Sequence, residues 1–148
     1  MVRVSVCAAE DLERAEVLDL YGAVGWTAYT EAPEVLMRAL GGSHRLVVAR
    51  REDRLVGLVR SISDGATVVH VQDILVHPDE QRTGLGRRLM DELFSGYEGV
   101  RQRVLLTDDE DGQRAFYEAL GLVEAHEHRP SLRSFVRFDQ APRAPRNP

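Results

Sequence analysis

Apolar and polar residues alternate along several short stretches of the chain, a pattern typical of β-strands with one buried face. At the N-terminus Val2, Val4 and Val6 alternate with Arg3 and Ser5. Further strands are predicted where apolar runs are bounded by polar turns, at residues 44–50, 54–63, 66–76 and 103–107. Short turns join the first three of these runs, so we expect them to form an antiparallel meander.

Apolar residues spaced three and four positions apart predict helices over residues 11–21, 33–41, 85–94 and 113–120. Pro33 is a favoured first-turn residue, and Gly121 is a favoured residue just beyond a helix end. After Gly121, the runs 122–128 and 132–138 predict a terminal hairpin that turns at Arg129-Pro130-Ser131.

This order of elements predicts a mixed α/β fold. The run 66–76, the helix 85–94 and the run 103–107 would form a right-handed crossover, so these two strands should be parallel. The result is a mostly antiparallel sheet with one parallel pair and with helices on both faces. We expect a single domain over residues 1–138, followed by a disordered proline-containing tail at 139–148.

Composition narrows the classes of function. The formal net charge is −5, which argues against sequence-independent nucleic-acid binding, because that needs many cations to neutralise phosphates. The single cysteine, Cys7, cannot form an intrachain disulfide and fits a reducing compartment. The N-terminus has no signal-peptide pattern, and no apolar run approaches the ~20 residues of a membrane span. We therefore expect a cytoplasmic protein that binds neither nucleic acid nor membrane.

The stretch PDEQRTGLGRRL, residues 78–89, connects a predicted strand to a predicted helix. The first N–H groups of a helix have no intrahelical partner, and the helix dipole adds partial positive charge there. Gly84 and Gly86 would let a phosphate approach the backbone, and Arg82, Arg87 and Arg88 could meet its charge. The alternative is a helix start whose glycines serve packing alone, since Gly-x-Gly is a weak signal.

Two common nucleotide-binding loops do not fit this stretch. A Walker A loop needs a lysine, and all 19 basic residues of the chain are arginines. A Rossmann turn needs a third glycine, where this chain has Leu89, and it lies in a βαβ unit rather than after a meander.

Two segments resemble the signatures of the GNAT superfamily, the acyl-CoA-dependent N-acetyltransferases. Residues 71–93 resemble its central motif, Gln/Arg-x-x-Gly-x-Gly/Ala, and residues 114–122 resemble its Phe/Leu-Tyr-x-x-x-Gly-Phe signature. The matching positions are Gln81, Gly84, Gly86, Phe116, Tyr117, Gly121 and Leu122. The spacing and the order of predicted elements match over roughly residues 2–138, so the chain is identified as a member of this superfamily.

The resemblance implies how acetyl-CoA would bind. The turn would cradle the pyrophosphate, and its implied residues are Gln81, Arg82, Thr83, Gly84, Leu85, Gly86 and Arg87. The preceding strand would splay from its parallel neighbour, so that the pantetheine arm adds along Leu75 and Val76. The amide of Ile74 would face the thioester carbonyl, and Phe116 would line the apolar side of the cofactor.

The resemblance also implies catalytic residues for direct attack of an amine on the thioester. Tyr117 occupies the position of the acid that protonates the leaving thiolate. His70 and Asp73 are both candidates for the base that deprotonates the amine, with structural roles as the alternatives. His70, Gln72 and Ile74 should share one face of their strand, with Asp73 on the other unless a bulge changes its direction.

The acceptor is expected to be an amine of a small molecule or peptide. Trp26, Tyr29 and Gln72 are the implied acceptor-binding residues, and a looser resemblance to the plastid-type serotonin N-acetyltransferase branch favours small aromatic amines. No metal is expected, because His126 and His128 lack a third nearby ligand in the sequence. The resemblance to the family also suggests a homodimer formed through the terminal hairpin. The rival interpretation is a module of the same fold that binds acyl-CoA without turnover.

Overall fold

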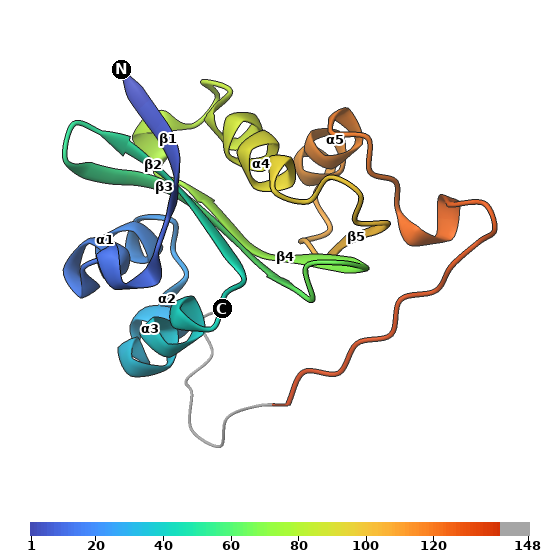
Figure 1. The fold of residues 1–148 in the computed structure, drawn as a ribbon, viewed down its shortest axis with the longest axis horizontal. Helices are drawn as coiled ribbons and strands as arrows, with labels where there is room; N and C mark the ends of the chain where they lie inside the picture. The colour runs from blue at the N-terminus through green and yellow to red at the C-terminus, as the bar shows by residue number, and fades with distance from the viewer. Residues whose placement is uncertain (140–148) are drawn as a thin grey trace. The chain divides into compact units, whose positions relative to one another are not determined.

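A five-stranded sheet is the centre of the first of two units in the computed structural model, which describes residues 1–139 (Figure 1). The strands are β1 (Val2–Cys7), β2 (Arg45–Arg51), β3 (Arg54–Ser63), β4 (Val68–Val76) and β5 (Gln102–Leu105), in that spatial order. Neighbours from β1 to β4 are antiparallel and β5 is parallel to β4, as the meander and the crossover predict.

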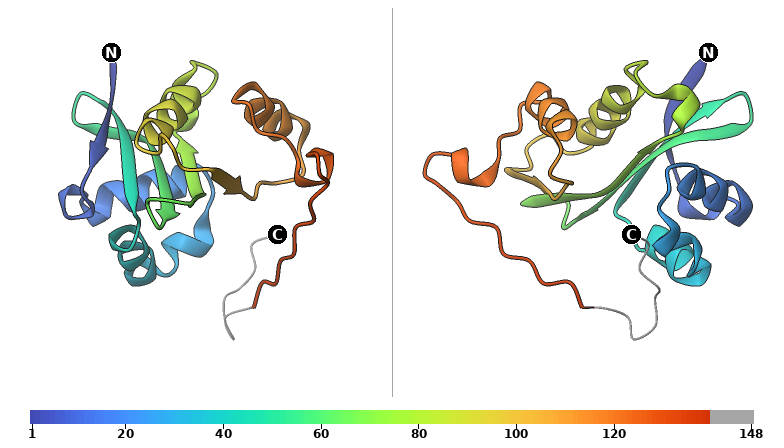
Figure 2. Two further views of the ribbon diagram at one scale, coloured as in Figure 1. Left: turned by 45° about the vertical axis from the view of Figure 1, so that its right-hand side comes forward. Right: turned by 180° about the vertical axis from the view of Figure 1, so that it is seen from behind.

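Helices cover both faces of this sheet, which confirms the predicted fold class (Figure 2). One face carries α1 (Arg14–Ala23), α2 (Thr27–Thr30) and α3 (Pro33–Gly41), and the other carries α4 (Leu85–Ser95). Short 3-10 helices precede α1 and α4, η1 at Ala9–Asp11 and η2 at Pro78–Glu80. The predicted helix over 11–21 therefore begins three residues later than expected, after η1.

The apolar stripes of these helices form the core. On the α1–α3 face, Leu20 and Leu36 are buried in one cluster with strand residues such as Leu58. On the α4 face, Leu89 lies against Gly57, where an added Cβ would be 3.0 Å from the leucine Cδ1 atom. Glycine at that position lets the helix approach the middle of β3 closely.

A β-bulge in β4 interrupts the regular alternation of its side chains. Arg60 of β3 pairs with Asp73, and the next residue, Ser61, pairs with Val71. Gln72 is therefore an extra residue in β4 with no opposite partner in β3. The alternation of side chains between the two faces of the sheet therefore shifts by one residue at the bulge.

The bulge corrects the prediction that His70, Gln72 and Ile74 share one face. Opposite residues of a ladder point to the same face. His70 pairs with Ile62, and Asp73 pairs with Arg60, two positions away, so both pairs point to the same face. Ile74 pairs with Val59, which is next to Arg60 and therefore points to the opposite face. His70 therefore lies on the face covered by α1–α3, and Ile74 lies on the α4 face.

The second unit begins at Thr107 and contains α5 (Asp111–Ala119) and η3 (Ala125–Glu127). The predicted hairpin over 122–138 is wrong, because these residues contain no strand. Glu124 and Glu127, three positions apart, both form ion pairs with Arg114, and a single 3-10 turn brings such positions together. A homodimer stays a prediction, but residues 122–138 form no hairpin that could be its interface.

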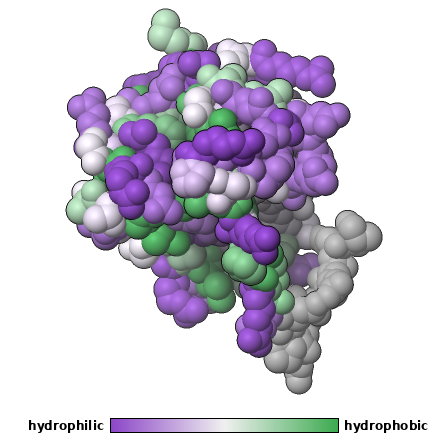
Figure 3. Space-filling view, turned by 90° about the vertical axis from the view of Figure 1, so that its right-hand side faces the viewer, coloured by the Kyte–Doolittle hydropathy of each residue, from purple (hydrophilic) through white to green (hydrophobic). Residues whose placement is uncertain are grey.

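Residues 128–139 follow η3 without regular structure and expose Phe135 and Phe138. The view in Figure 3 shows a mainly hydrophilic face with hydrophobic residues between the polar ones.

The single domain predicted over residues 1–138 stays a prediction, and the predicted disordered tail lies outside the described residues except for Asp139.

Candidate active site

The turn before α4 has the backbone conformation of an anion-binding nest. Arg82 has φ 62°, Gly84 has φ 82°, and Gly84 is the N-cap of α4. Alternating left-handed positions curl successive amides toward one point, and the amides of Leu85 and Gly86 belong to the first helical turn. The turn can therefore present several N–H groups, together with the positive end of the helix dipole, to a phosphate.

Contacts from the sheet hold this turn in place. The buried carboxylate of Glu80 accepts hydrogen bonds of 2.5 and 3.0 Å from Arg51 in β2. The Thr83 hydroxyl donates to the Glu80 carbonyl at 2.6 Å, and the Gln81 amide donates to the Val76 carbonyl at 3.1 Å. Gln81 and Thr83 thus hold the turn through their side chains, which leaves backbone amides as the groups that the turn can offer to a ligand.

The arginines around the turn have different surroundings. Arg82 is exposed at the left-handed position, and Arg87 forms an ion pair with Asp91 at 3.7 Å. Arg88 donates to the Val2 carbonyl at 2.8 Å, which ties the helix start to β1. Of these three arginines, Arg82 is therefore the best placed to form an ion pair with a phosphate.

The parallel ladder between β4 and β5 does not reach the stretch of β4 predicted to hold the pantetheine arm. The parallel ladder ends at the pair Val71 and Leu105, whereas β4 continues to Val76. Ile74, Leu75 and Val76 have no partner from β5. The splay of the two strands that the family resemblance implies stays a prediction. The Leu75 side chain is buried in the core and anchors this stretch, so its backbone edge is what a ligand could use.

Asp73 lies at the centre of a buried polar cluster between the sheet and the helices α1 and α2. It is 3% exposed, and its Oδ2 atom accepts from Arg60 Nε at 2.5 Å and from the Tyr21 hydroxyl at 3.0 Å. Its Oδ1 atom accepts from the Tyr29 hydroxyl at 3.0 Å. Burial, and then the charge of Asp73, raises the pKa of both tyrosines, so both hydroxyls stay protonated donors. This arrangement fits a structural carboxylate better than a base that meets substrate.

Arg60 is the member of this cluster that sequence reasoning missed. A signal was present, because an arginine within the apolar run RLVGLVRSIS needs a partner if the strand is buried. The bulge made the pairing with Asp73 hard to foresee, since regular alternation gives no basis for matching the two positions.

The aromatic residues predicted to bind the acceptor pack together beside this cluster. The ring centroids of Trp26 and Tyr29 are 6.1 Å apart, and Tyr21 lies 5.8 and 5.1 Å from them. Tyr21 is fully buried, whereas Trp26 and Tyr29 are partly exposed. On the same face, the Nε2 atom of partly exposed His70 lies 3.1 Å from the Oε1 atom of Gln72. The structure thus brings together Trp26, Tyr29, His70, Gln72 and Asp73.

Phe116 and Tyr117 belong to α5 in the second unit. Their ring centroids are 5.0 Å apart in an edge arrangement. Burial raises the pKa of the Tyr117 phenol, while a hydrogen bond with Thr107 acts in the opposite direction. The phenol is therefore protonated at neutral pH, as an acid must be before it donates a proton.

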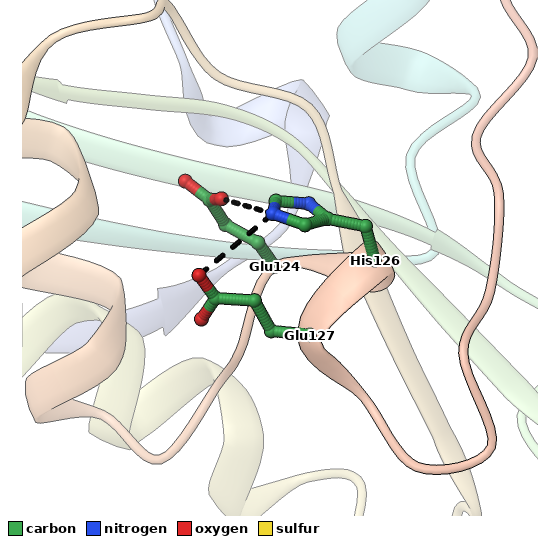
Figure 4. A group of neighbouring side chains, drawn as sticks. All are labelled: Glu124, His126 and Glu127. Atoms are coloured by element: carbon green, nitrogen blue, oxygen red, sulfur yellow. Dashed lines mark ion pairs between the residues drawn. The ribbon is translucent and has the colours of Figure 1, made fainter.

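Glu124, at the N-cap of η3, and His126 and Glu127 within it form a group with metal-ligand chemistry (Figure 4). All three are exposed, and His126 Nε2 lies 3.5 and 3.7 Å from the two carboxylates. Both carboxylates also pair with Arg114, whose charge would compete with a cation. The ion pairs with Arg114 therefore account for this group as part of a surface network of charges, without a metal ion.

Comparison with known proteins agrees with this geometry. The family model described as an acetyltransferase (GNAT) domain matches residues 10–132. The chain belongs to the GNAT acetyltransferase family. A GNAT-family acetyltransferase structure from Streptococcus pneumoniae TIGR4 has a TM-score of 0.80 and 30% identity, covering 95% of this GNAT chain and 100% of that chain.

Two curated relatives of this GNAT chain are also named as acetyltransferases. A Gibberella zeae protein of this kind is 35% identical over 75 residues, which are 49% of this chain. A Porphyra purpurea protein named "Uncharacterized N-acetyltransferase ycf52" is 31% identical over 71 residues, which are 48% of this chain. Each match spans only 41% of the relative's own length. Among the helices of residues 1–139, none is long and apolar enough to cross a membrane.

Proposed function

We propose that this protein is an acetyl-CoA-dependent N-acetyltransferase that moves an acetyl group directly to a primary amine of a small molecule or peptide. The observation that carries the proposal is the turn before α4, where Arg82 and Gly84 adopt left-handed conformations at the start of a helix. The part of β4 beyond Val71, which β5 does not pair with, supports it, because coenzyme A needs both an anion site and an extended site for its pantetheine arm.

The cofactor-binding residues proposed for this function divide into three groups. Backbone amides around Gly84, Leu85 and Gly86 would bind the pyrophosphate, with Arg82 at the rim. The β4 edge at Leu75 and Val76 would bind the pantetheine, and the Ile74 amide would donate to the thioester oxygen. Phe116 would contact the apolar part of the cofactor.

The reaction needs a neutral amine and a proton for the leaving group. The amine nitrogen attacks the thioester carbon, the C–N bond forms, and collapse of the tetrahedral intermediate breaks the C–S bond. The attacking nitrogen loses its extra proton to solvent as the amide forms, and Tyr117 gives its proton to the thiolate and regains one from solvent. His70 is our choice for the base, because it is partly exposed on the aromatic face, whereas three donors already surround the Asp73 carboxylate.

Thermal unfolding with and without acetyl-CoA tests the binding half of this proposal. A ligand at about 100 times its Kd stabilises the folded state by roughly 2.7 kcal/mol, which raises the Tm of a domain this size by several degrees. Acetyl-pantetheine has the same thioester and arm but no pyrophosphate, so it should stabilise much less. ATP and NAD should not stabilise the protein. Absence of any shift with acetyl-CoA would overturn the proposal.

Thiol release in the presence of an amine panel tests the catalytic half. The panel should contain arylalkylamines, polyamines, an aminoglycoside and peptides with a free N-terminus. Release with one class would identify the acceptor chemistry. Stabilisation by acetyl-CoA without thiol release from any amine would favour the rival module that binds acyl-CoA without turnover.

A further inference from the structure

The sheet face beneath α1–α3 is not covered along its whole length. On β3 this face carries Leu58, which is buried in the core, then Arg60, which is 5% exposed, and then Ile62, which is 51% exposed. On β4 the same face carries the buried Asp73 and the partly exposed His70. The cover over this face therefore ends between Arg60 and Ile62.

Ile62 and His70 lie directly opposite each other just beyond the end of this cover. They are partners in the antiparallel ladder between β3 and β4. Opposite residues of such a ladder have Cβ atoms about 4.5–5.5 Å apart on one face of the sheet. A substrate whose nitrogen reaches the His70 ring therefore has its next few atoms within reach of the Ile62 side chain.

The charged groups beside this pair already have partners. The Asp73 carboxylate accepts from Arg60 Nε at 2.5 Å and from the hydroxyls of Tyr21 and Tyr29 at 3.0 Å. Burial raises the pKa of both tyrosines, so both phenols are neutral. The cluster around Asp73 therefore offers no unmatched negative charge to a second cation on the acceptor.

Ile62 differs from an ordinary exposed apolar residue because of what lies next to it. A single apolar side chain on a protein surface needs no explanation. Here, however, the neighbours on the same face are the candidate base His70 and the Arg60–Asp73 pair, which the partly exposed Tyr29 contacts through its hydroxyl. An exposed apolar side chain opposite a candidate base indicates a surface that the carbon chain of a substrate covers.

We propose that Ile62 is a specificity-determining residue that contacts the carbon chain of the acceptor, and that the acceptor is a primary amine with an apolar substituent and no second cation. This inference rests on the proposed N-acetyltransferase function, with His70 as the base. The ammonium gives a proton to the imidazole, which passes it to solvent, and the neutral nitrogen attacks the thioester carbon. Contact with Ile62 removes apolar surface of the acceptor from water, whereas a second ammonium there would lose water without gaining a partner.

Two amines of matched length test this specificity. Hexylamine and 1,5-diaminopentane have the same number of non-hydrogen atoms and differ at the far end, where one has a methyl group and the other an ammonium group. The kcat/KM for each amine is measured by thiol release from acetyl-CoA. Wild-type protein should favour hexylamine by about 10-fold or more.

Variants of Ile62 should change the ratio of the two kcat/KM values. Ile62→Thr keeps a β-branched strand residue with less apolar surface, so it should lower the preference for hexylamine by about 5-fold. Ile62→Asp should reverse the preference, because a carboxylate can pair with the second ammonium. Both amines use the same base, so the ratio cancels any change in His70 itself.

Val6→Asp is the matched control. Val6 is also a β-branched strand residue that is 51% exposed. It lies on β1, however, and its ladder partner Val47 pairs in turn with Val59, which places Val6 on the opposite face of the sheet from Ile62. Val6→Asp should therefore keep the wild-type ratio.

The outcomes separate this inference from the proposed function. Wild-type protein that acetylates other amines but does not prefer hexylamine to the diamine would overturn the inference. An unchanged ratio in Ile62→Thr and Ile62→Asp would also overturn it, and so would an equal fall of the ratio in Val6→Asp. If Ile62→Asp does not fold, the ratio in Ile62→Thr decides. Wild-type protein that acetylates no amine would instead overturn the proposed function.

Discussion

Asp73 and Arg60 illustrate how one buried charged residue requires another. Both side chains are at least 94% buried, and the guanidinium and carboxylate lie 2.5 Å apart. We expect Asp73→Asn to reduce the free energy of unfolding by about 3–5 kcal/mol, because it leaves the Arg60 charge buried without its partner. Urea denaturation of the variant and the wild-type protein measures this difference.

A matched double variant separates the structural role of Asp73 from a catalytic one. Arg60→Met with Asp73→Leu removes both charges at similar volume and should recover most of the lost stability. If Asp73→Asn unfolds like the wild type but no longer releases thiol, Asp73 is the base and our choice of His70 is wrong.

Tyr117 can be tested by removing a single oxygen atom. We expect Tyr117→Phe to lower kcat by roughly 100-fold, because the departing thiolate loses its proton donor. Acetyl-CoA affinity, measured by calorimetry, should stay within about twofold. Phe116→Leu is the contrasting variant, since Phe116 is expected to contact cofactor and its loss should weaken binding. Unchanged turnover in Tyr117→Phe would remove Tyr117 from the mechanism.

At the scale of elements, the turn before α4 depends on a left-handed glycine. Gly84 has φ 82°, and an added Cβ would meet nothing within 4 Å, so any cost of substitution comes from the backbone conformation. Gly84→Val should destabilise this conformation by roughly 1–2 kcal/mol and weaken acetyl-CoA binding by about 10-fold or more.

Gly99 offers a control of the same kind elsewhere in the chain. It has φ 84° and equally open surroundings, but it follows α4 rather than preceding it. Gly99→Val should therefore lose similar stability without weakening acetyl-CoA binding, as measured by calorimetry. Equal loss of affinity in both variants would mean that Gly84 matters for general stability and not for the cofactor.

The elements that could be predicted from sequence are those with local causes. The helix at Pro33–Gly41 was predicted within one residue, because Pro33 and the glycines after it are local start and stop signals. The hairpin predicted over residues 122–138 was wrong, because the 3-10 turn at Ala125–Glu127 depends on contacts beyond its own sequence, such as the ion pairs of Arg114 with Glu124 and Glu127. The bulge at Gln72 was equally hidden, because it is defined by pairing with β3.

At the scale of the whole chain, the anion-binding turn was easier to predict than the acceptor side of the site. Gly84 and Gly86 lie two positions apart, so a short motif contains most of that information. The cluster around Asp73 brings together Tyr21, Tyr29 and Arg60, up to 52 residues away in sequence. Which hydroxyl donates to which oxygen depends on the register of two strands and the position of two helices.

Acid should destabilise the first unit through two carboxylates that join its elements. Hydrogen bonds from Arg50 to Glu16, and from Arg51 to Glu80, lower the pKa of both glutamates. Their folded pKa values lie below the ordinary value of about 4.3, so their contribution is complete above that pH and is lost as pH falls through the folded values. Urea unfolding from about pH 7 to pH 3 should show this decline, and Glu16→Gln with Glu80→Gln should make it shallower. Glu98→Gln, at a glutamate without an ion pair in residues 1–139, should decline like the wild type. Parallel curves for wild-type and double-variant protein would exclude these two glutamates as the source.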